Sequence, residues 1–280
     1  MRYRFRIRKI VNAVMFGITG LCTLTAVAVM FFILGYLLWH GGRSVNLAFF
    51  TQLPTPPGES GGGMANAIVG SCELIALAVL IGAPIGFLGG IYIAEFAGAT
   101  SAFVARYVTD LLNGVPSIVL GIFAYALVVV PTRHFSVLAG SVALSVIFIP
   151  IAVRTTEQFL QTVPSILREG ALALGATKPR TIATIIVPAA ARGIATGMML
   201  GVARIAGETA PLLFTSFNNR FWSTGLDQPA ASLPVMLFTY AISPYPDWHR
   251  QAWAAAVVLL GMVLFTNIAA RIFLSPAQRH

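Results

Sequence analysis

Long uninterrupted apolar stretches constrain this chain more than any other feature of its sequence. Six of them approach the roughly 20 residues that a helix needs to cross the hydrocarbon core of a bilayer. Unpaired backbone groups cannot face lipid, and a membrane β-barrel would show alternating rather than continuous apolar residues. We therefore predict an all-α membrane protein with six transmembrane helices. The predicted spans are roughly 11–39, 66–94, 112–131, 137–156, 193–214 and 251–274.

The composition agrees with this fold class. Of 280 residues, 57% are hydrophobic and only 10% are charged, and the mean hydropathy is +0.83. A soluble domain of this length would need a more polar surface. Cys22 and Cys72 lie in apolar stretches and indicate neither a disulfide framework nor a metal cluster. The net charge of +9 is more typical of basic inner loops than of nucleic-acid binding, so no nucleic-acid partner is expected.

The distribution of basic residues predicts the orientation in the membrane. Residues 1–10 carry four arginines and one lysine, and an apolar run follows through Trp39. Ala26-Val27-Ala28 imitates a signal-peptide cleavage site, but the apolar run continues far beyond the roughly 7–15 residues of a signal peptide. We expect an uncleaved first helix with its basic end inside. Thirteen basic residues then fall on inner segments and four on outer segments, which favours cytoplasmic termini.

Proline and glycine mark the interruptions. The stretch PTPPGESGGG (54–63) predicts an exposed outer loop, and Asn113-Gly114-Val115-Pro116 predicts a break inside the third span. The apolar piece 233–241 is too short to cross and predicts a half-helix or re-entrant element. The expected organisation is a cytoplasmic N-terminus (1–10), a first transmembrane helix (11–39), a periplasmic loop (40–65), a helical membrane core (66–274) with a cytoplasmic segment (157–192), and a cytoplasmic tail (275–280).

Within that cytoplasmic segment, residues 168–188 read REGALALGATKPRTIATIIVP, which predicts two short helices joined at Gly175 and closed by Pro188. Glycine at this point can take the left-handed conformation that ends a helix, and proline is tolerated in the first turn of the next. From the residues alone, two interpretations stay open. The hairpin is either a solvated connector or a docking site whose small residues allow a cytoplasmic partner to approach closely.

The spacing in this hairpin resembles the coupling motif of ABC-importer permeases. The family pattern is Glu-Ala-Ala, three residues, Gly, nine residues, then Ile, any residue, Leu-Pro; Gly170 and Val187 depart from it conservatively. The resemblance implies a coupling helix that sits in a cleft of a separate ATPase subunit. The ATPase-coupling residues that it implies are Glu169, Gly170, Ala171, Gly175, Lys178, Arg180 and Pro188.

Four further stretches resemble the PstA-type permease family of bacterial phosphate importers. This resemblance implies the type I ABC-importer permease architecture, import of inorganic phosphate and a place in the bacterial inner membrane. It also implies a heterodimer with a PstC-type permease, two PstB-type ATPase subunits that bind ATP and Mg, and a periplasmic PstS-type phosphate-binding protein. The stretches are GGGMANAIVGS (61–71), NGVPSIVLGIFAY (113–125), ARIAGETAPLLFT (203–215) and LPVMLFTYA (233–241).

The sequence contains no set of residues that predicts catalysis. Its only lysines, Lys9 and Lys178, do not follow the glycine-rich pattern of a phosphate-binding P-loop. The four histidines lack zinc-site spacing, and no constellation of histidine, cysteine, serine and carboxylate indicates an enzyme. We therefore expect a transporter subunit with no catalytic residue, no metal site and no cofactor of its own.

Charged residues in the fifth span are the strongest candidates for the transport pathway. Arg204 and Glu208 are one helical turn apart, and Gly193, Gly197 and Gly201 precede them on the same predicted face. Because charges at the bilayer centre are costly, this face is expected to meet protein or water. One explanation is close helix packing pinned by an ion pair. The other is a phosphate pathway or gate, since arginine can donate paired hydrogen bonds to an oxyanion.

Other polar groups give weaker signals. Glu95 and Asp110 are expected to form a solvated cluster with Arg106 at the inner surface, and Arg154 with Glu157 either braces the hairpin or anchors an interface.

The predicted break in the third span adds two more pathway candidates. Asn113 and Ser117 line the pathway if the helix breaks there, or else Pro116 is a plain kink between packed helices. Glu73 either faces a cavity or lies near the outer edge of the second span.

Three other functions remain compatible with these features. Within the same class, sulfate or molybdate could replace phosphate, because nothing in the charge pattern separates these anions. From another class, an ion-coupled secondary transporter would show paired broken helices in two inverted halves. A signalling role through the same complex is a further alternative.

Overall fold

The computed structural model describes residues 2–59 and 61–274; Met1 and the predicted tail 275–280 lie outside the described residues. Within these ranges the chain is helical and contains no β-strand, which confirms the predicted fold class. In chain order the elements are α1 (Arg2–Gly42), α2 (Leu47–Thr51), α3 (Ala65–Ile91), the π-helical turn η1 (Tyr92–Phe96), α4 (Ala99–Gly114), α5 (Ser117–Ala124), the π-helical turn η2 (Tyr125–Val129), α6 (Val130–Thr132), α7 (Val137–Gln161), α8 (Ser165–Ala173), α9 (Lys178–Thr181), the π-helical turn η3 (Ile182–Ile186), α10 (Val187–Ala206), α11 (Ala210–Thr215), α12 (Leu233–Ala241) and α13 (Pro246–Leu274).

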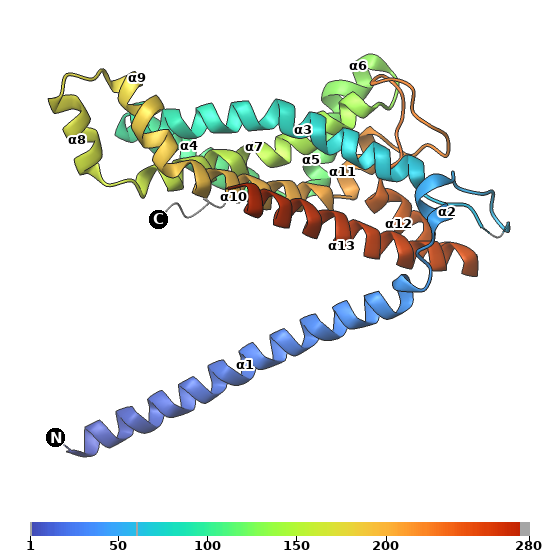
Figure 1. The fold of residues 1–280 in the computed structure, drawn as a ribbon, viewed down its shortest axis with the longest axis horizontal. Helices are drawn as coiled ribbons and strands as arrows, with labels where there is room; N and C mark the ends of the chain where they lie inside the picture. The colour runs from blue at the N-terminus through green and yellow to red at the C-terminus, as the bar shows by residue number, and fades with distance from the viewer. Residues whose placement is uncertain (1, 60, 275–280) are drawn as a thin grey trace.

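The long helices run between two distinct ends of the molecule (Figure 1). At one end lie the start of α1 and the hairpin α8–α9, and at the other lie α2, α6 and the start of α13. We call these the hairpin end and the loop end. Five helical segments of the described chain are long and apolar enough to cross a membrane, and the bent pair formed by α4 and α5–α6 supplies a sixth. The alternation between the two ends matches the predicted six crossings.

Helices α3 and α7 pack side by side in the same direction and form the centre of the bundle. Their close approach depends on glycines of α3. A Cβ atom at Gly86 would lie 2.3 Å from the Cβ of Ala152, and one at Gly90 would lie 2.5 Å from the Cβ of Thr156. Helices in a membrane gain little from the hydrophobic effect between them, so such small residues, which let backbones approach, carry much of the packing.

Helix α10 packs on another side of α7, in the opposite direction. A Cβ atom at Gly193 would lie 2.1 Å from the ring of Phe159, and one at Gly201 would lie 2.9 Å from Phe148. Gly197, between them, meets α7 in the same way. The predicted glycine face therefore contacts protein, and the packing explanation is confirmed for these three glycines.

The predicted bounds of the fifth span, 193–214, are wrong. One continuous helical run extends from Lys178 through η3 and α10 to Ala206, and the chain breaks before α11. Pro188 does not close the hairpin, because the helix passes through it. In a regular α-helix a proline ring clashes with the carbonyl four residues earlier. Here the wider turn η3 ends just before Val187 and Pro188, so the residue four positions before the proline lies in this wider turn. Turn η2 precedes Pro131 in the same manner.

The third crossing is broken where the sequence predicted it. Helix α4 ends at Gly114, Val115 and Pro116 are extended, and α5 begins at Ser117. The two halves of this crossing meet at an angle of 101°. The predicted half-helix 233–241 is also confirmed, since α12 has these bounds and its first four residues are buried.

Helix α1 stands apart from the bundle and leaves it at an angle (Figure 1). None of the residues in its most apolar 18-residue window is buried within the chain. It contacts α13 near its last turns, where a Cβ at Gly41 would lie 2.4 Å from the carbonyl oxygen of Trp253. Tyr36 also meets the Trp253 ring edge-on, at 5.5 Å between centroids. Most of α1 is thus free to face lipid or another subunit.

Candidate coupling and translocation site

The predicted hairpin is present and is closed by a specific helix C-cap. Gly175 has φ +82°, the left-handed conformation that the sequence required. Its N–H donates to the carbonyl of Leu172 at 3.0 Å, and the N–H of Ala176 donates to the carbonyl of Ala171 at 3.1 Å. This pair of bonds is the Schellman motif, which satisfies carbonyls left free at a helix end. The turn between α8 and α9 is therefore well determined by local hydrogen bonds.

Most of the predicted ATPase-coupling residues lie on the outer surface of the hairpin. Leu174 at its tip is 90% exposed, although it is large and apolar. Exposed apolar groups on a projecting element are typical of a surface that binds a partner. Ala171 is the exception, since it is the buried residue of α8. The exposed members of the predicted set are Glu169, Gly170, Gly175, Lys178, Arg180 and Pro188.

Arg168, at the start of the hairpin, is tied to two other helices. Its guanidinium donates to Glu95 Oε1 from Nε at 3.0 Å and from Nη2 at 2.8 Å. It also donates to the carbonyls of Leu160 and Val163, each at 2.7 Å. Leu160 lies in the last turn of α7 and Val163 just after its end, where backbone acceptors lose their regular helical partners. The sequence-based expectation that Glu95 joins a solvated cluster with Arg106 is therefore wrong.

Lys178, at the start of α9, also reaches Glu95. Its ammonium group donates to the backbone carbonyl of Glu95 and lies 5.0 Å from the centre of the Phe96 ring. A cation at the C-terminal end of a helix is favoured by the helix dipole. Lys178 therefore stabilises the end of η1, in addition to any role on the exposed surface.

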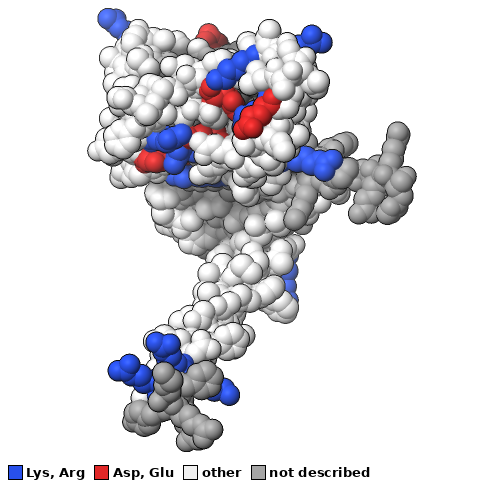
Figure 2. All heavy atoms as spheres, turned by 90° about the vertical axis from the view of Figure 1, so that its left-hand side faces the viewer, with Lys and Arg blue, Asp and Glu red and all other residues white. Residues whose placement is uncertain are grey.

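A second ion-pair network connects α4 with α7. Glu157, whose side chain is 1% exposed, accepts from Arg106 Nε at 2.5 Å and from Arg154 Nη1 at 2.7 Å. Gln161 also donates to Glu157 at 3.1 Å, and Arg154 reaches Asp110 at 3.0 Å. Arg154 and Glu157 thus do pair, but they hold α4 rather than the hairpin. Figure 2 shows acidic and basic side chains intermingled at the hairpin end.

The predicted pairing of Arg204 with Glu208 is wrong. Both residues are described, and no ion pair joins them. The helix ends at Ala206, and the N–H groups of Gly207 and Glu208 donate to carbonyls only three residues earlier. Glu208 therefore leaves the helical register that an i,i+4 pair needs. Glu208 is half-buried beyond the helix end, and Arg204 is exposed on the last turn of α10.

The two breaks in the bundle lie in neighbouring segments. Helix α11 follows Glu208 and packs on α5, where a Cβ at Gly121 would lie 2.6 Å from Cα of Pro211. Ser117 begins α5, and Asn113 lies in the last turn of α4; both are half-buried. The predicted pathway residues are thus distributed over adjacent broken helices.

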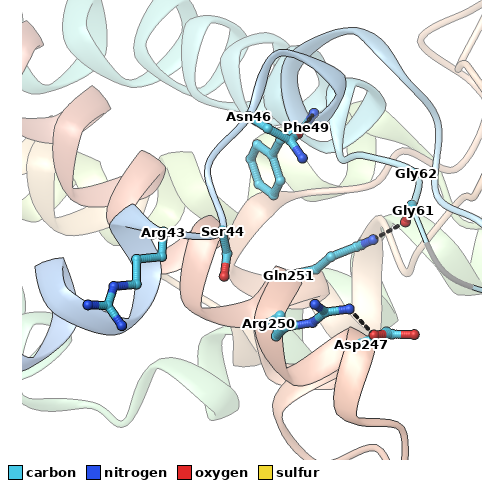
Figure 3. A pocket seen from close by; sticks show the side chains of 9 residues that line it. All are labelled: Arg43, Ser44, Asn46, Phe49, Gly61, Gly62, Asp247, Arg250 and Gln251. Atoms are coloured by element: carbon cyan, nitrogen blue, oxygen red, sulfur yellow. Dashed lines mark hydrogen bonds and ion pairs between the residues drawn. The ribbon is translucent and has the colours of Figure 1, made fainter.

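A polar pocket at the loop end had no counterpart in the sequence-based predictions (Figure 3). It has a volume of about 350 Å³ and lies between the segment after α1 and the start of α13. Gln251 donates to the carbonyl of Gly61 across it, and Arg250 pairs with Asp247 at its edge. Arg43 comes from the end of the α1 segment and points away from this pair. The residues come from distant parts of the chain, so no local pattern marked them.

These features define an all-helical membrane permease of the type I ABC-importer fold. The solved inward-facing MetNI methionine ABC transporter is similar, with a TM-score of 0.59, 19% identity, and coverage of 75% of this chain and 95% of that one. A solved amino acid ABC transporter has a TM-score of 0.57, 17% identity, and coverage of 75% and 91%. At these identities the likeness establishes the fold alone.

Sequence comparison then defines the family. Residues 82–275 match the model of the binding-protein-dependent transport system inner membrane component, and the chain belongs to this family. It is 46% identical to the phosphate transport system permease protein PstA of Yersinia pestis, over 90% of this chain and 88% of that protein. It is 43% identical to PstA of Haemophilus influenzae over 96% of each chain. A probable PstA of Methanocaldococcus jannaschii is 36% identical over 91% of this chain and 90% of that protein.

Proposed function

We propose that this chain is a permease subunit of an ATP-driven importer of inorganic phosphate. The relatives named above are phosphate transport permeases and match nearly the whole chain, which favours phosphate over sulfate or molybdate. The observation that carries the coupling to ATP hydrolysis is the exposed hairpin between two crossings, with an apolar tip that the rest of the chain leaves uncovered. An ion-coupled transporter would not need such a projection.

The energy source belongs to a partner. An ATPase subunit binds ATP and Mg²⁺, and its closure moves the hairpin α8–α9 through the exposed surface around Glu169 and Leu174. Because α8 follows α7 directly and α9 continues into α10, a displacement of the hairpin reaches both crossings. The two crossings then change the opening of the pathway, as alternating access requires.

The pathway is shared with a second permease, of the PstC type in our proposal. Arg204 supports this arrangement. It lies one helical turn beyond Gly201, which packs against Phe148 in the middle of α7, so it is at membrane depth. Its side chain is exposed in the isolated chain. Since a charge facing lipid there costs roughly 2.5–3.5 kcal/mol, Arg204 is expected to face water or another subunit.

Arg204, Glu208, Asn113 and Ser117 are the residues that we assign to the pathway or its gate. The arginine attracts a phosphate oxyanion, and the helix breaks beside the other three provide polar backbone at membrane depth. Contact with the ion is transient, because a permanently strong site would slow its release. A periplasmic phosphate-binding protein of the PstS type delivers the ion to the loop end, with the hairpin and both termini on the cytoplasmic side of the inner membrane.

Reconstitution into liposomes with a second permease and an ATPase tests this function. We expect ATP-driven uptake of labelled phosphate, and we expect unlabelled sulfate or molybdate to inhibit this uptake only weakly. Arg204→Gln should reduce uptake at least tenfold and leave the complex assembled, because the change removes a charge from the pathway without altering volume greatly. Arg192→Gln, an exposed arginine on the same helix, is the matched control and should transport normally. Uptake without any ATPase, or normal uptake by Arg204→Gln, would contradict the proposal.

A further inference from the structure

We infer that Glu95 is a positioning residue that fastens the coupling hairpin to the end of α3, so that α3 moves with the hairpin. This inference rests on the proposed function, because it assigns a role in the coupling step. Glu95 and Arg168 are separated by 73 positions in the sequence and meet only in the folded chain. Their ion pair therefore adds a connection that the covalent chain does not provide.

The pair is largely protected from solvent. The Glu95 side chain is 7% exposed, and that of Arg168 is 25% exposed. Exposed ion pairs contribute little to stability. A buried carboxylate that loses its partner, in contrast, is left with an uncompensated charge, which is strongly destabilising. Separation of the hairpin from α3 would leave Glu95 in that state. The pair accordingly resists separation.

The same arginine also holds the end of α7. Through its bonds to the carbonyls of Leu160 and Val163, Arg168 joins three segments at one point: α3 with its turn η1, the end of α7, and α8. Lys178 adds a bond from α9 to the backbone of Glu95. Both halves of the hairpin are thus tied to one residue at the end of α3.

An apolar cluster lies beside this junction, and its packing could hold the hairpin to α3 without the ion pair. Leu160, Ile186 and Ile194 are buried there, and Phe87 and Ile91 of α3 pack against them. This packing holds α3 near α7 and α10, which are neighbours in any case. No residue named in this cluster belongs to α8, whose side-chain hydrogen bonds to η1 come from Arg168. The ion pair therefore ties α8 itself directly to the end of α3.

Transport per ATP hydrolysed is the first test, in liposomes that contain the complete transporter. Glu95→Gln should keep the complex assembled and ATP hydrolysis within twofold, while phosphate carried per ATP falls at least threefold. Arg168→Gln should lower the phosphate carried per ATP by at least as much as Glu95→Gln. The double variant should carry no less phosphate per ATP than Arg168→Gln alone. Asp110→Asn loosens an ion pair at the same end of the molecule but not at the hairpin. It should keep the phosphate carried per ATP within twofold of the unmodified transporter. Losses that multiply in the double variant would overturn the inference.

A distance measurement separates this inference from the proposed function. Spin labels are placed on exposed positions of the hairpin and of α3, at Ser165→Cys and Leu88→Cys, after Cys22 and Cys72 are replaced by serine. In the nucleotide-free complex we expect a narrow distance distribution that Glu95→Gln broadens and Glu95→Asp partly restores. An unchanged distribution in Glu95→Gln would overturn the inference. If phosphate were the wrong substrate, uptake would fail in the unmodified complex, but the distance result would stand.

Discussion

Helices α1 and α7 are similarly apolar, yet they relate to the rest of the chain in opposite ways. None of the most apolar window of α1 is buried within the chain, whereas 67% of the corresponding window of α7 is. The difference lies in the neighbours. Glycines of α3 and α10 meet α7 along its length, while Gly17, Gly20 and Gly35 of α1 have no other segment within 4 Å. An apolar run therefore predicts that a helix crosses the membrane, but small residues on facing helices decide what it packs against.

The largest expected effect comes from filling the contact between α3 and α7. Gly86→Leu should destabilise the folded chain by about 3 kcal/mol or more, because its Cβ would already lie 2.3 Å from Ala152. Thermal unfolding of the purified protein in detergent measures the change. Gly20→Leu in α1 is the matched control and should leave the melting temperature nearly unchanged. Equal effects at the two positions would remove the distinction between the helices.

A smaller effect is expected from the charges that hold α4 against α7. Glu157→Gln should cost about 1–3 kcal/mol, since it weakens the charged hydrogen bonds to two arginines at a buried position. The same unfolding measurement applies. Asp247→Asn weakens an exposed pair at the loop end and should cost less than about 1 kcal/mol. If the two variants were equally stable, burial would not be what strengthens the inner network.

The smallest effect on stability should come from detaching α1. Gly41→Val would push a side chain into the Trp253 carbonyl and separate α1 from α13. We expect trypsin cleavage after Arg43 to accelerate severalfold, because the junction opens more often. The melting temperature of the bundle should stay within about 2 °C. Gly42→Val, at a position with open space around it, should be cleaved at the original rate.

Much of the fold was predictable because it depends on local chemistry. Apolar length predicts the crossings, Gly175 predicts the hairpin turn, and Pro116 predicts the break in the third crossing. Each of these features follows from a few consecutive residues. The half-helix α12 was predictable for the same reason, since its short apolar run cannot span a bilayer.

The remainder depended on contacts between distant segments. Periodicity assumes one regular helix through residues 204–208, but Gly207 ends it and separates the two charges. Glu95 and Arg168 are 73 residues apart, so no spacing rule links them. One sequence signal could have suggested the role of Arg168: it is a cation in the helix that follows α7, close to a helix end where cations often bind free carbonyls. Its partner on α3 needed the structure.

The exposed guanidinium of Arg204 has a consequence for biosynthesis. A copy of the chain inserted without a companion would carry this cation toward hydrocarbon, and the membrane would thin or admit water around it. In the proposed arrangement a second permease covers this cation, so insertion is expected to cost less free energy when that companion is synthesised close by.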